Sequence, residues 1–354
     1  MSDFSFSNII KDKPGWYRGD FHVHSTCSDG DYPIGTVTRI AEAEGLDFFA
    51  ITDHNTIEAF KSLEEDLNTL VIPGLEVSFR LGHFNLFGLH GWEDWMEGIV
   101  EIVPSKLDDG DDADVAALLE QLTSDGLITS INHPCLPPWA WEFGSTDLRY
   151  LHCLEIWNDL YWPGNVTGNP DAVKMWISWL NAGHRITGIG GSDYHYPPRT
   201  EHGLPGERLG MPTTYVYARE LSTDGILEGI KQGRAYVTKG PKVTFLASLD
   251  GSDYMIGDDM GEQSGDIEFS ATVTNKPAGI KVQLIKCGEV IAEKQLDGEA
   301  TDVKFADRVN SKASVWYSLF ITDLEGDVLA ITNPIYVGPL RKPKLNLYSD
   351  FYPG

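Results

Sequence analysis

The chain has 354 residues, which is long for one domain and suits two. Apolar residues make up 42% and charged residues 23%, so disorder, collagen and coiled coil are excluded as descriptions of the whole. The net charge of −26 disfavours a polymeric nucleic-acid partner, because so acidic a surface repels a phosphate backbone. It does not exclude a small anionic substrate, because bound divalent cations reverse the local field.

The sequence also indicates a compartment. No apolar run approaches the roughly 18 residues that a membrane span needs, and the first residues lack the apolar segment of a secretory signal. The four cysteines are widely spread without a CxxC pair, which favours reduced thiols over a disulfide framework. We therefore expect a cytoplasmic protein with no membrane partner, and the oligomeric state stays open.

The first two thirds of the chain alternate short apolar runs with helical patterns, which predicts a parallel α/β architecture. Strands are expected at 48–52, 70–78, 127–133, 151–158, 185–193 and 213–218. Helices are expected at 55–67, 113–126, 171–182 and 223–233.

After Gly240-Pro241 the pattern changes to short runs of period two, separated by Gly, Asp and Asn turns. Seven such runs, at 243–250, 267–275, 280–288, 289–297, 301–309, 314–323 and 331–337, predict an immunoglobulin-like β-sandwich. The predicted organisation is a domain at 1–241, a β-sandwich domain at 242–338 and a C-terminal tail at 339–354.

Polar residues gather where the apolar runs of the first domain end. His22 and His24 lie two apart in DFHVHS, so an extended backbone points both imidazoles to one face. Asp29, His54, Glu76, His83, His133, Asp193 and His195 occur at or near the ends of later runs. Because ligands gather at the carboxyl ends of strands in α/β folds, we expect these side chains to converge.

Each of these residues alone has a simpler interpretation: an isolated His as a hydrogen-bonded packing residue, and Asp29 in SDG as a turn former. The joint pattern of six His and three carboxylates is different, because uncompensated it is costly to bury. Imidazole and carboxylate without thiolate suit zinc, manganese or iron. Nine ligands exceed the four of one tetrahedral zinc, so two or three metals sharing a carboxylate are predicted.

Five motifs in order, HVHSTCSDG, AITDHNT, GLEVS, INHP and GGSDYH, resemble those of the PHP (polymerase and histidinol phosphatase) superfamily. The segment LGMPTTYVYARELSTDGILEGIKQGRAYVTKGP is similar to its carbaryl-hydrolase-type branch, CehA/McbA. The resemblance covers about residues 15–241. It implies a distorted (β/α)7 TIM-like barrel with a two- or three-metal site.

The resemblance also implies the ligand sets. One metal takes His22, His24, Glu76 and Asp193, a second shares Glu76 with His83 and His133, and a third takes Asp29, His54 and His195. Asp29 stands where many relatives carry His. In many relatives the ligand after the bridging Glu aligns with Asn85, and we place it at His83 instead, on the same face.

The activity implied by the resemblance is hydrolysis, most commonly of phosphoesters. A hydroxide bridging two metals is the expected nucleophile, with the bridging Glu76 and the metal-bound His195 at the catalytic centre. Arg199 and Arg208 are candidate phosphate anchors, or else surface salt bridges. His202 is a candidate proton donor to the leaving group, or else an exposed loop residue. Asp53 either orients His54 or caps a helix, and Glu155 either reaches the cavity or is a plain strand-end carboxylate.

Two other functions remain open. Trp139, Trp141 and Trp162 occur in Pro- and Gly-rich loops after strands, where they either pack in the core or line a substrate pocket. If they line a pocket, a carboxylic or carbamate ester hydrolase acting on an aryl substrate is the rival. A non-catalytic metal-dependent binding module is the alternative of another class.

Overall fold

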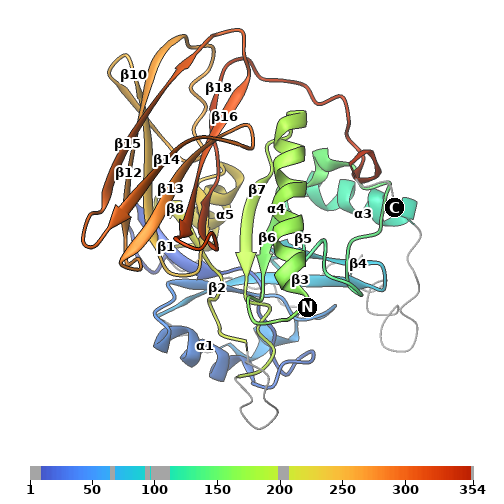
Figure 1. Cartoon of the computed structure of the whole chain (residues 1–354). Coiled ribbons are helices and arrows are strands. Elements are labelled where there is room, and N and C mark those ends of the chain that lie inside the picture. Colours follow the sequence, from blue (N-terminus) through green and yellow to red (C-terminus); the bar gives the residue numbers. More distant parts are fainter. Residues whose placement is uncertain (1–8, 64–67, 92–95, 97–111, 198–206, 352–354) are drawn as a thin grey trace.

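A computed structural model of the chain describes residues 9–63, 68–91, 96, 112–197 and 207–351 (Figure 1). Its helices are α1 (Ile34–Ala43), α3 (Asp112–Ser124), α4 (Asn165–Ala182) and α5 (Thr223–Lys231), with 3-10 turns η1 (Glu58–Ser62), η2 (Leu148–Tyr150) and η4 (Tyr348–Asp350). The strands of the first part are β1 (Gly15–Asp20), β2 (Phe48–Ile51), β3 (Leu70–Phe79), β4 (Gly82–Phe87), β5 (Ile128–Ile131), β6 (Cys153–Asn158), β7 (Thr187–Gly191), β8 (Thr213–Ala218) and β9 (Ala235–Thr238).

The strands of the second part are β10 (Lys242–Leu249), β11 (Ser252–Met255), β12 (Gly265–Thr274), β13 (Gly279–Lys286), β14 (Glu289–Asp297), β15 (Asp302–Val309), β16 (Val315–Asp323), β17 (Val328–Thr332) and β18 (Ile335–Val337). The predicted run at 331–337 is split by Asn333-Pro334, and proline has no N–H to donate to a neighbouring strand. In the described part of the chain no helix is both long enough and apolar enough to cross a membrane.

The strands of the first part form a large mixed sheet, in the order β9-β8-β1-β2-β3-β4-β5-β6-β7. The pairs β1–β2, β2–β3, β5–β6 and β6–β7 are parallel, as the strand–helix alternation predicts. Strand β4 runs antiparallel to both β3 and β5, so this part departs from a purely parallel arrangement. The sheet curls until β7 meets β8, where Gly190 N donates to Thr214 Oγ1 and that hydroxyl donates to Gly190 O, both at 2.8 Å. An α/β fold is thus confirmed, and a closed seven-stranded barrel stays a prediction.

The helices predicted at 113–126, 171–182 and 223–233 are present as α3, α4 and α5. Helix α4 ends at Gly183, whose φ of 105° is the left-handed conformation that suits glycine after a helix. It begins six residues before the predicted start and contains Pro170. Of the helix predicted at 55–67, the described residues form only the turn η1. Residues 64–67 lie outside the described part of the chain.

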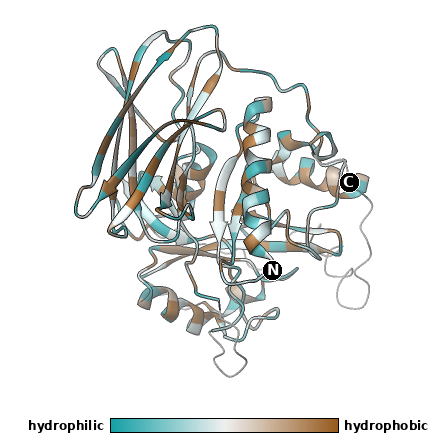
Figure 2. Ribbon diagram, viewed as in Figure 1, coloured by the Kyte–Doolittle hydropathy of each residue, from teal (hydrophilic) through white to brown (hydrophobic). Residues whose placement is uncertain are grey.

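The C-terminal strands form two sheets that share one core. One sheet has the order β11-β10-β12-β15, and the other, β14-β13-β16-β17, continues the large sheet through the pairing of β17 with β9. Hydrophobic and hydrophilic residues alternate along these strands (Figure 2), and Phe269 of β12 meets Tyr317 of β16 with ring centroids 4.7 Å apart. An immunoglobulin-like topology and the boundary at 241 stay predictions.

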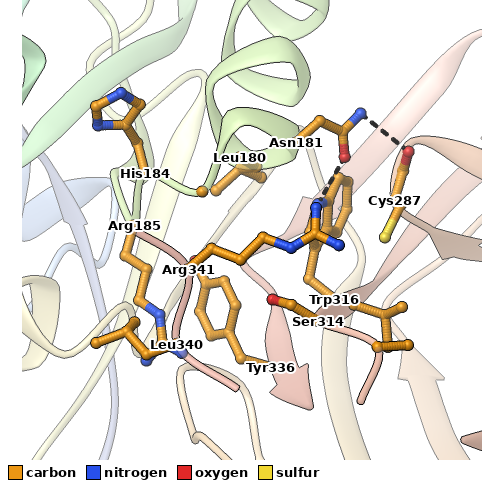
Figure 3. Close-up of a pocket in the computed structure, with 13 residues that line it drawn as sticks. Leu180, Asn181, His184, Arg185, Cys287, Ser314, Trp316, Tyr336, Leu340 and Arg341 are labelled. Atoms are coloured by element: carbon orange, nitrogen blue, oxygen red, sulfur yellow. Dashed lines mark hydrogen bonds between the residues drawn. The ribbon is translucent and has the colours of Figure 1, made fainter. Parts of the chain in front are cut away.

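Helix α4 docks onto the C-terminal strands through Asn181. Its side chain donates to Cys287 O at 3.1 Å and accepts from Trp316 Nε1 at 2.9 Å, at the edge of a pocket of about 400 Å³ (Figure 3). All four cysteines are free, as predicted.

The segment after β18 crosses back over α4 to the first part of the molecule (Figure 1). Tyr348 is 3% exposed and its ring lies 6.0 Å from that of Trp179, which is fully buried in α4. Leu148 N donates to Asn346 O and Tyr348 N donates to Thr146 O, both at 2.8 Å. This tail is therefore part of the packed core around α4.

Truncating the packed aromatic residue tests that conclusion. We expect Tyr348→Ala to lower the free energy of unfolding by roughly 3 kcal/mol, because it leaves a cavity against Trp179. Leu340→Ala, in the same segment but 68% exposed, is the control and is expected to change stability by less than about 0.5 kcal/mol. Chemical denaturation of the full chain measures both, and equal effects would show that the tail does not pack as described.

Candidate metal centre

The nine side chains singled out at strand ends come together in the structure. His22 and His24 follow β1, His54 follows β2, Glu76 lies in β3 and His83 in β4. His133 follows β5, Asp193 and His195 follow β7, and Asp29 lies on the loop after His24. They form four overlapping groups whose ligand atoms lie within 4.8 Å of one another, namely His24/Asp29/His54/His195, His22/His133/Asp193, His22/His24/Glu76 and His54/Glu76/His83.

Glu76 is the centre of the cluster and is fully buried. Its Oε1 lies 3.3 Å from His22 Nε2, and its Oε2 lies 2.8 Å from His54 Nδ1. Three further imidazoles surround the same carboxylate: His83 at 3.1 Å, His24 at 3.4 Å and His133 at 3.5 Å. One carboxylate surrounded by several imidazoles suits a ligand that two cations could share.

Several of these buried atoms have no hydrogen-bond partner. His22 Nε2, His24 Nδ1, Glu76 Oε2 and His133 Nδ1 are all buried without one, although acidic and imidazole atoms lie close by. An unpaired buried polar atom costs free energy, so native proteins rarely retain several together. Imidazole nitrogens and carboxylate oxygens that converge in this way fit divalent cations. This set of donor atoms suits zinc, manganese and iron alike.

The backbone at the strand ends is strained where ligand candidates occur. His133 has φ of 27° and Asp193 has φ of 53°, in the left-handed region that non-glycine residues rarely adopt. Such conformations persist where the surrounding structure imposes them, and they concentrate at functional sites. With this backbone conformation, the side chains of His133 and Asp193 both lie in the cluster.

Electrostatic coupling fixes the charges of the cluster. Burial raises the pKa of the Glu76 carboxyl, but His54, His22 and His83 outweigh it and hold that pKa well below its usual range. Burial lowers the pKa of His24 to about 3, and the neighbouring His195 and His54 act in the same direction. Burial also lowers the pKa of His195, but the Asp29 carboxylate reverses this effect and raises it to about 10.

A second layer of polar groups orients the cluster. Glu155 accepts from His22 Nδ1 at 3.0 Å and from His133 N at 2.7 Å, which turns His22 Nε2 toward Glu76 and Asp193. Asn158 Nδ2 donates to both Glu155 and Asp193 at 3.2 Å, and Asn132 Nδ2 donates to Glu76 at 2.8 Å. Glu155 therefore reaches the site through the imidazole that it holds.

Asp53 holds the loop that carries Asp29. Its carboxylate accepts from Ser25 N, Ser25 Oγ and Ser28 Oγ, each at 2.7 Å. Asp53 therefore fixes the position of the loop that carries Asp29 and does not cap a helix. The Nδ1 atom of His54 hydrogen bonds to Ser78 Oγ at 2.6 Å.

His83 faces the cluster and Asn85 does not. Asn85 lies opposite Glu76 in the strand register, but its Nδ2 donates to Phe21 O at 3.2 Å. The longer His83 side chain reaches Glu76 from its place opposite Ser78, two pairs along the strands.

The structure does not bring Arg208 to the cluster. Its guanidinium pairs with Glu44 at 2.9 Å and lines a separate pocket with Arg18 and Lys242. The surface salt-bridge interpretation fits this placement, and a role for Arg208 as a phosphate anchor stays a prediction. Arg199 and His202, the other anchor and proton-donor candidates, lie outside the described residues.

A cavity of about 320 Å³ opens over the cluster, within the range of small-molecule sites. The three tryptophans separate here: Trp139 and Trp162 line the cavity with ring centroids 5.9 Å apart, whereas Trp141 is 3% exposed in the core. The wall also contains Asn158, Asp159 and Glu207, which the sequence did not single out. Asn158 ends the run LHCLEIWN and Asp159 directly follows it, so the strand-end pattern would have found them.

Comparison with known proteins bears on this centre. Residues 20–134, which include seven of the nine clustered side chains, match the family model described as PHP domain. A segment of 62 residues is 40% identical to the phosphoribosyl 1,2-cyclic phosphate 1,2-diphosphodiesterase of Eggerthella lenta. The match covers 17% of this chain and 24% of that enzyme, so the chain matches about a quarter of its relative's length. These findings support the PHP superfamily and a hydrolase, and leave the CehA/McbA branch a prediction.

Solved structures show weaker likenesses. The chain is similar to a two-domain protein from Bacteroides vulgatus described as containing a predicted PHP-like metal-dependent phosphoesterase, with 18% identity, a TM-score of 0.46, and coverage of 94% of this chain and 98% of that one. It is also similar to the lesion-specific endonuclease EndoQ from Pyrococcus furiosus, with 16% identity, a TM-score of 0.43, and coverage of 68% and 64%.

Cation binding at this centre is expected to release protons. With a pKa of about 10, His195 carries a proton at neutral pH that a cation must displace. The apparent affinity for Mn²⁺ or Zn²⁺ should therefore rise with pH up to about 10 and fall as the solution is acidified. Calorimetric titration in buffers of different ionisation enthalpy measures the released protons, and a binding heat independent of buffer and pH would contradict this arrangement.

Removing the group that orients His22 is expected to weaken metal binding without unfolding the chain. Glu155→Gln should lower the affinity by about 10–100-fold, the usual cost of losing a partner that orients a metal ligand. The matched control is Glu289→Gln, an exposed position on β14. Competition with a metal-binding dye measures both variants, and equal affinities would show that Glu155 does not orient the site.

Proposed function

We propose that this chain is a metal-dependent phosphoesterase that hydrolyses a small phosphate ester in the cavity over the cluster. The observation that carries the proposal is the fully buried Glu76 carboxylate, which five imidazoles face. Buried atoms of His22, His24, His133 and Glu76 itself have no hydrogen-bond partner. The PHP domain match over residues 20–134 and the short match to a phosphodiesterase support the same reaction class.

The proposed ligand sets are those that the resemblance implies, with Glu76 shared between two cations. His22, His24 and Asp193 would complete one set, His83 and His133 the second, and Asp29, His54 and His195 would form the third. When bound, such cations lower the pKa of a coordinated water toward neutrality and neutralise charge that develops on the phosphoryl oxygens. The chain's own contribution is to hold the ligands rigidly and to exclude bulk water through the buried wall below the cavity.

A specific observation favours the second candidate, an ester or carbamate hydrolase acting on an aryl substrate. Trp139 and Trp162 line the cavity, and their ring faces suit a planar apolar group. A non-catalytic binding module is less well supported, because a cavity that opens directly onto the ligand atoms leaves room for a reacting group.

Model esters separate the three functions. With Mn²⁺, Zn²⁺ or Fe²⁺ supplied, we expect turnover of bis- and mono-p-nitrophenyl phosphate, and Glu76→Gln should abolish metal binding and turnover together. The loss should exceed the about 10–100-fold cost of an orienting residue. Glu289→Gln, an exposed position, is the control.

The contrary outcomes are distinct. Turnover of 1-naphthyl esters alone would assign the chain to ester hydrolysis. No turnover of any ester by protein whose metal is fully bound would favour the binding module.

A further inference from the structure

Asp159 is an acidic residue of the cavity wall that belongs to none of the four ligand groups in the described part of the chain. It directly follows β6 and is 5% exposed. Its Oδ1 accepts from Tyr161 N at 3.0 Å, and its own amide donates to Gly191 O at 3.2 Å. The carboxyl is thus held rigidly in a wall that it shares with Asp193 and His195.

The same wall offers an apolar surface next to this acid. Trp162 lies three residues after Asp159, and its amide approaches Asp159 O at 3.4 Å. Trp139, which is 38% exposed, meets Trp162 edge to face, and Leu136 lies beside them in the lining. An ester bound with its phosphoryl group over the cluster has this surface available for the organic group that departs.

The protonation of Asp159 suits a proton donor. Burial raises the pKa of its carboxyl to about 7, the Tyr161 amide opposes that rise and the Asp193 charge adds to it. Burial, the largest cause, does not depend on the charge of the cluster. A carboxyl that keeps its proton near neutral pH is the requirement for general acid catalysis by an Asp.

We propose that Asp159 is the general acid of this hydrolysis, and that the site is built for phosphate esters of poor leaving groups, such as alkyl alcohols and simple phenols. The proposal rests on the proposed function and adds to it the class of leaving group. Esters whose alcohol leaves readily as an anion need no such donor.

In the proposed hydrolysis of a phosphate ester, water replaces the leaving alcohol on phosphorus. A water oxygen forms a new bond to phosphorus, and the bond from phosphorus to the leaving oxygen breaks with its electron pair going to that oxygen. The Asp159 carboxyl gives its proton to the leaving oxygen, which departs as the neutral alcohol. The carboxylate then regains a proton from solvent, and the proton lost by the attacking water returns to solvent.

The test compares two esters that differ only in the leaving group. Phenyl phosphate needs a proton on its leaving oxygen, whereas p-nitrophenyl phosphate does not. We expect Asp159→Asn to lower kcat/KM for phenyl phosphate by about 10²-fold or more, and to leave kcat/KM for p-nitrophenyl phosphate within a few-fold of wild type. Asn keeps the acceptor for Tyr161 N, and Asp159→Glu should restore part of the phenyl phosphate activity.

The controls separate catalysis from folding and from charge. Asp171→Asn removes a partly exposed acid of α4, paired with Lys174 at 2.8 Å, and should affect neither ester. Metal content and thermal stability of Asp159→Asn should match those of wild type. Equal losses on both esters, or none, would overturn the role of Asp159 while wild-type turnover upholds the phosphoesterase. No wild-type turnover of p-nitrophenyl phosphate would overturn the proposed function, and the role of Asp159 with it.

Discussion

The burial of one carboxylate, Glu76, among five imidazoles is the constraint on which the rest of the first part of the chain depends. Removing a charge from water is costly, and the cost is offset only by opposite charge or by ligated cations. In this chain the compensating groups come from β1, β2, β4 and β5, so the sheet must bring all four to one rim. The order of the strands and the position of the site are therefore two consequences of the same requirement.

Support for that carboxylate extends outward in layers. From β6, Glu155 fixes the His22 imidazole and Asn158 fixes Asp193, while Asp53 fixes the loop of Asp29. Asp20, fully buried, accepts from the amides of His22, Ser192 and Gly210, and so ties the ends of β1 and β7 to the segment that leads into β8. Side chains positioned by such packed hydrogen bonds keep their geometry better than side chains on unsupported loops. Substrate selection is expected to reside in cavity-lining residues outside the ligand sets, such as Trp139, Asp159 and Trp162.

Much of the site was predictable from sequence because strand ends in an α/β sheet share an edge. That rule brought His22, His54 and His133 together although they are far apart in the chain. It does not extend to Arg208, which was singled out because it follows the last metal motif and whose guanidinium pairs with Glu44. It was silent on the three tryptophans, because only tertiary packing decides that Trp141 turns inward while Trp139 and Trp162 turn to the cavity. The antiparallel β4 was equally unpredictable, since period-two runs do not reveal direction.

Anomalous diffraction from crystals of the chain grown with Mn²⁺ or Zn²⁺ tests the central claim most directly. We predict at least two anomalous peaks, both within bonding distance of the Glu76 carboxylate and each completed by imidazoles of the cluster. A single peak elsewhere, or a cluster whose imidazoles hydrogen bond to one another with no ion between them, would contradict it.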